Sequence, residues 1–155
     1  MLFSKKCIYG LRATLYVASL ESHQFVSIRQ ISENLNISFS FLTKILQELT
    51  QKNIMVSYRG PKGGVSLSKS AAQIKLIEIV NAFENEAYLS ECILGLSNCG
   101  SQIPCPLHEH WLAIRNDIKS LLTNTSLYQL ASQINKTGMR LTDIPAAITT
   151  PKNLS

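Results

Sequence analysis

The spacing of apolar residues predicts helices in the first 52 residues. The segments 5–21, 28–35 and 39–52 each place apolar residues every three or four positions, the period of an amphipathic helix. Ser27 with Gln30 gives the second segment a capping-box start, Asn36 suits a tight turn, and Ser38 caps the third segment. A short helix followed across such a turn by a longer one is typical of a helix-turn-helix. The expected buried residues of the longer helix are Leu42, Ile45, Leu46 and Leu49.

A β-hairpin is predicted directly after these helices. Residues 54–58 and 65–68 alternate apolar residues with polar or small ones, as half-buried strands do. Between them, residues 59–64 read RGPKGG, a glycine-rich basic turn. Helices followed by a hairpin in this order are the layout of a winged helix, with the hairpin as its wing.

The pattern changes in the second half of the chain. A helix predicted over 76–84 is followed by residues 88–106, which break every period and contain several Gly and Pro residues. A long helix then starts near Leu107, and a short final helix over 126–135 precedes an expected flexible tail. The apolar residues of the long helix recur at steps of four, three, four and three, a heptad-like seam that predicts pairing with a second copy. These seam residues are Leu107, Trp111, Ile114, Ile118 and Leu121.

Positive charge is confined to the first half of the chain. The formal net charge is +5, but residues 1–75 carry ten Lys or Arg against three acids, whereas residues 76–155 carry five against seven. The two halves therefore have net charges of +7 and −2. This asymmetry indicates a module that binds a polyanion, with nucleic acid as the leading candidate. Charge alone leaves open a basic surface without a partner.

The predicted longer helix and the wing offer side chains suited to DNA. The face opposite the apolar stripe presents Ser, Thr, Lys and Gln, which can hydrogen-bond base edges or phosphates in a major groove. The N-terminus of this helix favours a phosphate, and a basic residue on a narrow hairpin can enter a minor groove. The expected DNA-binding residues are Ser38, Ser40, Thr43, Lys44, Gln47, Arg59 and Lys62.

Three of the four cysteines lie within the irregular segment. Cys92, Cys99 and Cys105 are followed by His108 in the pattern C-x6-C-x5-C-x2-H. Thiolates and imidazole bind zinc, copper or iron–sulfur clusters. Structural zinc sites generally use two close pairs of ligands, and only Cys105 and His108 are close here, so the spacing favours a cluster over zinc. The remaining Cys7 is expected to be a small buried residue of the first helix, although it could approach the loop.

These residues resemble the Rrf2 family of winged-helix transcription regulators, with its IscR-like and NsrR-like members. The likeness runs from about Phe3 to Ala131, and the wing motif followed by the cysteine loop is its most specific part. The other matching stretches are Tyr9–Ala13, Ile31–Leu35 and Phe41–Leu46.

The resemblance implies a homodimeric transcription factor that holds an iron–sulfur cluster with Cys92, Cys99 and Cys105. IscR-like members add a His after the third Cys, and His108 stands there. NsrR-like members instead recruit an acid from the partner's first helix, and residues 7–11 contain none. This favours 2Fe–2S over 4Fe–4S. Cluster-free relatives that sense cysteine metabolism lack the full cysteine set.

The sequence thus predicts a mainly α fold, a winged helix-turn-helix with a two-stranded wing plus a long C-terminal dimerisation helix. The expected division is a DNA-binding domain over 1–86, a cluster-binding loop over 87–106, a dimerisation helix with a short final helix over 107–135, and a flexible tail over 136–155. The dimer contact is expected along 107–122.

The expected function is regulation at a double-stranded DNA operator, in response to iron–sulfur, redox or nitric-oxide status. The alternative is a DNA-binding regulator with a structural zinc site or no metal that responds to a small molecule or a partner protein. We expect no enzyme, because paired carboxylates, a phosphate loop and a nucleophile with its base are all missing. No apolar stretch is long enough to span a membrane, so a cytoplasmic protein without a membrane partner is expected.

Overall fold

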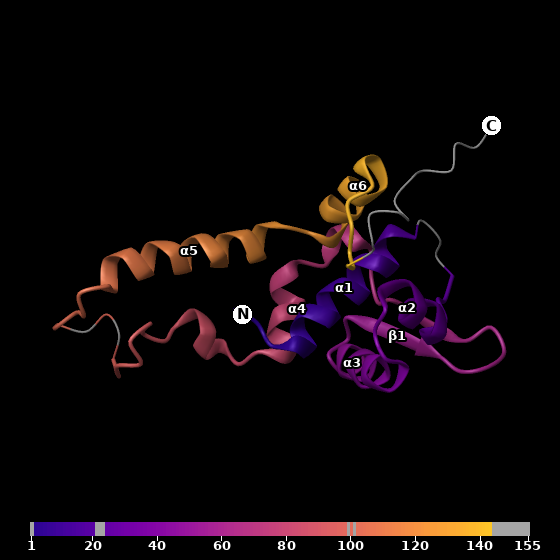
Figure 1. The fold of residues 1–155 in the computed structure, drawn as a ribbon, viewed down its shortest axis with the longest axis horizontal. Coiled ribbons are helices and arrows are strands. Elements are labelled where there is room, and N and C mark those ends of the chain that lie inside the picture. The colour runs from indigo at the N-terminus through magenta and orange to yellow at the C-terminus, as the bar shows by residue number, and fades with distance from the viewer. Residues whose placement is uncertain (1, 21–23, 99, 101, 144–155) are drawn as a thin grey trace.

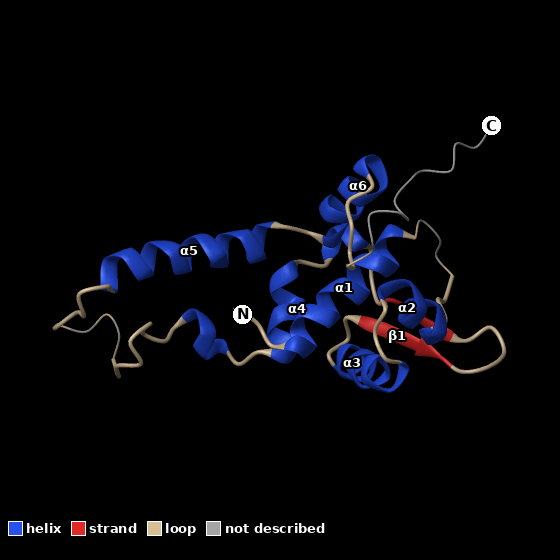
Figure 2. Ribbon diagram, in the orientation of Figure 1, coloured by secondary structure: helices blue, strands red, loops and turns tan. Residues whose placement is uncertain are grey.

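The computed structural model describes residues 2–20, 24–98, 100 and 102–143, and most of these lie in helices around a small sheet (Figure 1; Figure 2). The predicted fold class is confirmed. The elements in chain order are α1 (Lys5–Ser19), α2 (Ile28–Leu35), α3 (Phe39–Gln51), β1 (Met55–Tyr58), β2 (Gly64–Leu67), η1 (Ala71–Gln73), α4 (Leu76–Phe83), η2 (Glu86–Leu89), α5 (His108–Asn124) and α6 (Leu127–Thr137).

The ends of α2 and α3 follow the predicted caps. The Ser27 hydroxyl accepts a hydrogen bond from the Gln30 backbone N–H at 3.1 Å, and the Ser38 hydroxyl accepts one from the Phe41 N–H at 3.3 Å. Asn36 ends α2 in the left-handed conformation, with φ 52° and ψ 47°. Because local hydrogen bonds and the turn at Asn36 define these helix boundaries, the helix-turn-helix could be predicted from the sequence.

The wing is an antiparallel pair in which Met55 lies opposite Leu67 and Tyr58 opposite Gly64. The chain before α2 joins its edge, since Val26 and Val65 exchange two backbone hydrogen bonds of 2.8 Å. A Cβ atom at Gly64 would overlap the Val26 carbonyl group. Only glycine therefore allows the wing and the start of α2 to approach this closely.

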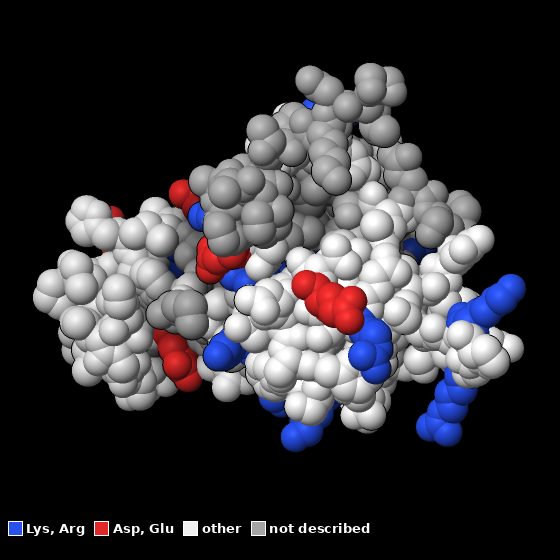
Figure 3. Space-filling model, turned by 45° about the vertical axis from the view of Figure 1, so that its right-hand side comes forward, with Lys and Arg blue, Asp and Glu red and all other residues white. Residues whose placement is uncertain are grey.

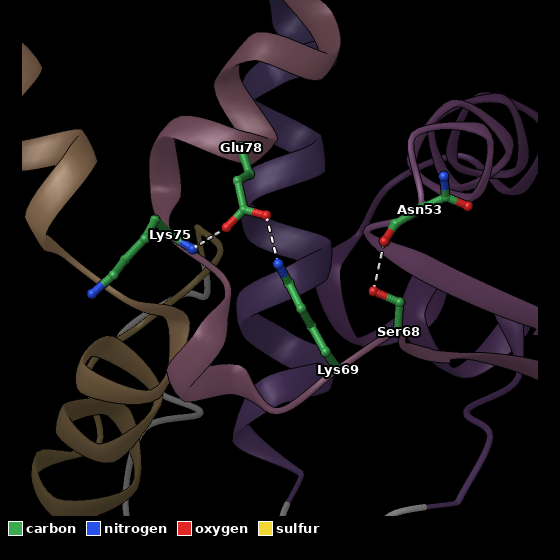
Figure 4. Close-up of polar contacts among 5 residues, drawn as sticks. All are labelled: Asn53, Ser68, Lys69, Lys75 and Glu78. Atoms are coloured by element: carbon green, nitrogen blue, oxygen red, sulfur yellow. Dashed lines mark hydrogen bonds and ion pairs between the residues drawn. The ribbon is translucent and has the colours of Figure 1, made fainter.

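Polar contacts fasten the base of the wing (Figure 4). The Ser68 hydroxyl donates to the Asn53 carbonyl oxygen at 2.6 Å. The Glu78 carboxylate accepts from the Lys75 backbone N–H at 2.8 Å and from Lys69 Nζ at 2.9 Å. Burial alone would raise the pKa of Glu78, but these hydrogen bonds and the nearby lysine charges outweigh it and lower that pKa. The first turn of α4 is thus tied to the chain that leaves the wing.

One hydrophobic core joins α1, α2, α3, α4 and the wing. α1 and α4 approach closely at Gly10, where a Cβ atom would collide with the Phe83 ring. Tyr9 of α1 contacts Phe41 of α3 edge to face, with 5.7 Å between ring centroids. The four residues predicted to bury α3 are all buried.

The final helix, α6, packs against the winged helix. α6 packs along α1, and the Asn135 side chain donates to the Ser19 carbonyl oxygen at 3.1 Å. α6 includes Lys136 and Thr137, which the sequence assigned to the flexible tail. Beyond it, the Thr142 hydroxyl donates to the Leu35 carbonyl oxygen at the end of α2, at 3.2 Å. The chain therefore returns to the helix-turn-helix after α5.

The cysteine arm, which we define as residues 90–98, 100 and 102–107 together with α5, projects away from the winged helix (Figure 1). Within the described chain, residues 90–107 form no helix or strand, as predicted, while the single turn of η2 just before them was not anticipated. The only buried residue of α5 is Leu122, near its C-terminal end. None of the described helices has the length and apolar character required to cross a bilayer.

Candidate DNA-binding surface and cysteine loop

A groove of about 880 Å³ lies between α3 and the wing. On the helix side it is lined by one stripe that includes Phe39, Thr43, Gln47 and Thr50, at successive steps of four, four and three residues. On the other side it is lined by Ser57, Tyr58, Arg59 and the turn glycines. Ser27, Ile28 and Arg29, at the start of α2, also line the groove.

The structure brings three of the predicted DNA-binding residues into this groove: Thr43, Gln47 and Arg59. Ser40, Lys44 and Lys62 are exposed but are not among its lining residues. Ser38 is exposed at the N-terminus of α3, where its hydroxyl caps the helix. The face of α3 that lines the groove is therefore rotated slightly from the predicted one: it includes Phe39 and leaves out Ser40 and Lys44. Contact of the predicted residues with DNA stays a prediction.

The sequence missed three large side chains that line the groove: Arg29, Phe39 and Tyr58. Tyr58 packs against Phe25 with 5.5 Å between ring centroids, so an aromatic pair supports the wing side. Phe39 carried no polar signal, and Arg29 looked like an ordinary charge on a short helix. Only the packing of the wing beside α3 places them on one surface.

The surface formed by α3 and the wing is basic. Figure 3 shows Lys and Arg side chains projecting from the wing end of the molecule and from its lower edge. Lys6 Nζ lies 2.6 Å from Glu48 Oε1, so the acid on α3 is paired with a lysine of α1. A basic surface beside a helix of suitable size for the major groove fits a DNA duplex.

The two ends of the cysteine loop meet. Cys92 Sγ and Cys105 Sγ lie 3.6 Å apart, and the His108 backbone N–H donates to the Cys105 carbonyl oxygen at 3.0 Å. Gly100 sits beside the His108 ring, since a Cβ atom there would lie 3.5 Å from Cε1. The predicted ligand Cys99 lies outside the described residues. Among the described residues, no three His, Cys, Asp or Glu side chains gather as a metal site would require.

A hollow of about 500 Å³ borders Cys92. It is lined by loop residues on both sides of this cysteine, including Glu91, Gly95 and Leu96. Cys92 itself is buried, whereas Cys105 is half-buried. The two thiols, and the imidazole three residues after the second of them, are soft or borderline donors whose chemistry fits an iron–sulfur cluster or a soft metal ion, although the described side chains do not gather around one point.

Side chains of α5 hold the start of this loop. Trp111 Nε1 donates to the Glu91 carbonyl oxygen at 3.0 Å. Arg115 Nη1 donates to the Ser90 carbonyl oxygen at 3.0 Å and lies 3.5 Å from that of Glu91. The backbone just before Cys92 is therefore attached to α5, a link with no signature in the sequence.

Cys7 is fully buried in the core of the winged helix, as predicted. Burial, the negative charge of Glu84 and a hydrogen bond to that carboxylate raise the pKa of Cys7 to about 12. The thiol therefore stays protonated near neutral pH and acts as a small packed side chain.

The apolar residues predicted to form the seam of α5 fall into a packed group and an exposed group. Ile118 packs against the core and Trp111 is half-buried against the loop. Leu107, Ile114 and Leu121, spaced seven residues apart, are exposed, with Ile114 at 51% and Leu121 at 61%. This leaves an apolar stripe along the outer face of α5.

A family model of Rrf2, described as an iron-dependent transcriptional regulator, matches residues 3–133. The chain belongs to the Rrf2 family. An HTH-type transcriptional regulator named in Haemophilus influenzae is 31% identical over 135 residues, which cover 87% of this chain and 89% of that protein. Another named in Aquifex aeolicus is 29% identical over 132 residues, covering 84% and 91%.

Solved structures show the same fold. CymR, the global cysteine regulator of B. subtilis, is 26% identical, with a TM-score of 0.70 and coverage of 84% of this chain and 95% of that one. IscR of T. potens is 21% identical, with a TM-score of 0.69 and coverage of 88% and 90%, and supports the fold alone. The Rrf2 protein described here is a transcriptional regulator and not an enzyme.

Proposed function

We propose that this Rrf2 protein is a homodimeric regulator that binds a double-stranded DNA operator and senses iron–sulfur, redox or nitric-oxide status through an iron–sulfur cluster. The observation that carries the sensing part is the 3.6 Å approach of the Cys92 and Cys105 sulfur atoms within a loop attached to α5. The membership of an iron-dependent family supports it.

In this proposal α3 enters the major groove and the wing follows the backbone or the minor groove. Thr43, Lys44 and Gln47 would contact base edges or phosphates, together with Ser38, Ser40, Arg59 and Lys62. The basic surface and the groove between α3 and the wing support this arrangement. The binding energy would come largely from phosphate contacts, so affinity should fall as salt concentration rises.

Pairing of two copies would use residues 107–122. The exposed stripe of Leu107, Ile114 and Leu121 has the seven-residue spacing of a helix that packs on a parallel or antiparallel twin. Covering these side chains removes apolar surface from water. A two-fold dimer would present two copies of α3 to half-sites about one turn of DNA, roughly 34 Å, apart.

Cys92, Cys99, Cys105 and His108 would hold the cluster, with 2Fe–2S favoured over 4Fe–4S. When bound, an iron–sulfur cluster supplies a charged centre that reacts with oxidants and nitric oxide. The chain contributes two thiols from opposite ends of the loop and an imidazole at the start of α5. These residues would hold the two ends of the loop together.

Trp111 and Arg115 would carry the state of the loop to α5. Trp111 donates to the Glu91 carbonyl oxygen and Arg115 to those of Ser90 and Glu91, directly before Cys92. A loop held at its cysteines keeps these carbonyls in place, whereas a released loop lets them move. The orientation of α5 would then change the separation of the two α3 helices.

Anaerobic purification tests this function. The expected result is brown protein whose visible and Mössbauer spectra report a 2Fe–2S centre, with different affinities of the iron-loaded and iron-free forms for one operator at one salt concentration. Colourless protein with about one zinc per chain would support a structural metal instead. Equal affinities of the two forms for every operator tested would remove sensing through this loop.

The similarity to CymR favours one alternative, a regulator without metal that responds to a small molecule or a partner protein. Under that alternative, anaerobic protein carries neither iron nor zinc. Its DNA affinity then changes with added metabolite or partner protein, and not with iron loading.

A further inference from the structure

Phe39 is a large apolar side chain at the first position of α3, and 51% of it is exposed. It is also the first residue of the α3 stripe that lines the groove, ahead of Thr43 and Gln47. The cysteine arm projects from the opposite side of the molecule to the wing, and the wing lines the same groove as Phe39 (Figure 1).

The residue that follows it on the stripe adds to this apolar character. The Thr43 hydroxyl donates to the Phe39 carbonyl oxygen at 2.8 Å, so its only proton is used within the helix. Gln47, one turn further along, is exposed and retains an amide that can bond to a base edge. The N-terminal end of the stripe is thus suited to apolar contact and its middle to hydrogen bonding.

We infer that Phe39 is a specificity-determining residue that contacts the C5-methyl group of thymine in the major groove. This inference rests on the proposed DNA binding and deepens it. The thymine methyl is the apolar group that base edges present there, and Phe is among the side chains that contact it. The first residues of a recognition helix are those that reach base edges in helix-turn-helix proteins. The Phe39 side chain has no hydrogen-bond donor and therefore cannot bind a phosphate.

The test uses the full chain and a duplex enriched from a random double-stranded DNA library by the wild-type protein. Each thymine of that duplex is replaced in turn by deoxyuridine, which removes only the methyl group. Wild type should lose affinity about fourfold at one thymine per half-site, the fold-change that corresponds to ~0.8 kcal/mol for one buried methyl group. Phe39→Ala should bind the thymine and deoxyuridine duplexes equally.

Two further variants control the result. Phe39→Leu keeps an apolar side chain and should retain part of the discrimination, whereas Tyr128→Ala removes an exposed aromatic residue of α6 and should retain all of it. All variants should unfold at temperatures close to wild type, because both positions are exposed.

The inference is overturned if no deoxyuridine substitution weakens wild-type binding, or if one weakens wild type and Phe39→Ala equally. A wild-type protein that enriches no sequence from the library would instead overturn the proposed function itself. The two failures are therefore distinguishable.

Discussion

The winged helix buries its large apolar side chains, whereas the cysteine arm leaves several of its own exposed. In the winged helix, Ile45 and Leu49 of α3 are completely buried, and α3 packs against α1, α2, α4 and β1. In the arm, Ile103 is 89% exposed, and Ile93, Leu94 and Leu96 are exposed as well. The first region completes its own core, whereas the second presents apolar groups that its own chain does not cover.

The two regions are therefore stabilised in different ways. Burial of apolar surface holds the helix-turn-helix and wing together without any partner. Leu122 attaches the arm to the core near the C-terminal end of α5, and the hydrogen bonds of Trp111 and Arg115 join the loop of the arm to its helix. We propose that a second copy along α5 and a cluster between the cysteines supply the further contacts of the arm.

The largest effect is expected from Cys105→Ala. This variant should lose iron completely while the winged helix stays folded, because Cys105 lies in the arm and outside the core. Iron per chain and visible absorption of anaerobic protein are the measurements. Cys7→Ala is the matched control, and it should keep full iron because Cys7 lies in the core. Full iron in Cys105→Ala would show that the ligand assignment is wrong.

The comparison of cores is tested most directly by one substitution in each region. Ile45→Ala should lower the free energy of unfolding by about 2–5 kcal/mol, because it leaves a cavity in the core. Ile103→Ala should change it by less than about 0.5 kcal/mol in the isolated chain. Urea denaturation followed by circular dichroism measures both. Similar losses in the two variants would contradict the distinction between the regions.

Pairing through α5 is tested by Ile114→Glu, which puts a charge on the exposed stripe. The dimer dissociation constant should rise at least about a hundredfold, equivalent to ~2.8 kcal/mol, because the charge would have to be buried. Sedimentation equilibrium gives the constant. Asn116→Glu, at an exposed position outside the stripe, is the control and should leave pairing nearly unchanged.

The basic surface is tested by Lys44→Ala and Arg59→Ala. Each should weaken operator binding by roughly 1–3 kcal/mol if the residue contacts bases or a groove. Fluorescence anisotropy at one salt concentration measures the loss. Lys136→Ala removes a charge from α6 and serves as the control. Either α3 or wing variant binding like wild type would remove that residue from the DNA footprint.

The smallest effect is expected at Glu78, at the base of the wing. Its pKa is lowered from 4.5 in the folded protein, so its contribution to stability is present above the unfolded pKa and is lost as pH falls through the folded pKa. Wild type should therefore lose more stability between pH 7 and acidic pH than Glu78→Gln. Urea denaturation at several pH values measures this. Glu33→Gln, at an exposed position of α2, should retain the wild-type slope.

The winged helix could be predicted from the sequence. Apolar spacing, the caps at Ser27 and Ser38, the turn at Asn36 and the glycine-rich wing are local signals, and each acts within a few residues of where it stands. The irregular loop around the cysteines was likewise predicted from the sequence, whereas metal binding by this loop stays a prediction. Local chemistry of this kind leaves a pattern that can be read along the chain.

How these parts pack against one another could not be predicted from the sequence. The tertiary structure placed α6 on α1, turned the groove-facing stripe of α3 to include Phe39, and attached Trp111 to the carbonyl oxygen of Glu91. Every residue has a backbone carbonyl group. A hydrogen bond from a side chain to a carbonyl oxygen twenty residues away therefore leaves no recognisable pattern in the sequence. The face of a helix that meets a wing is set by the packing of the whole core, and residues far apart in sequence settle it together.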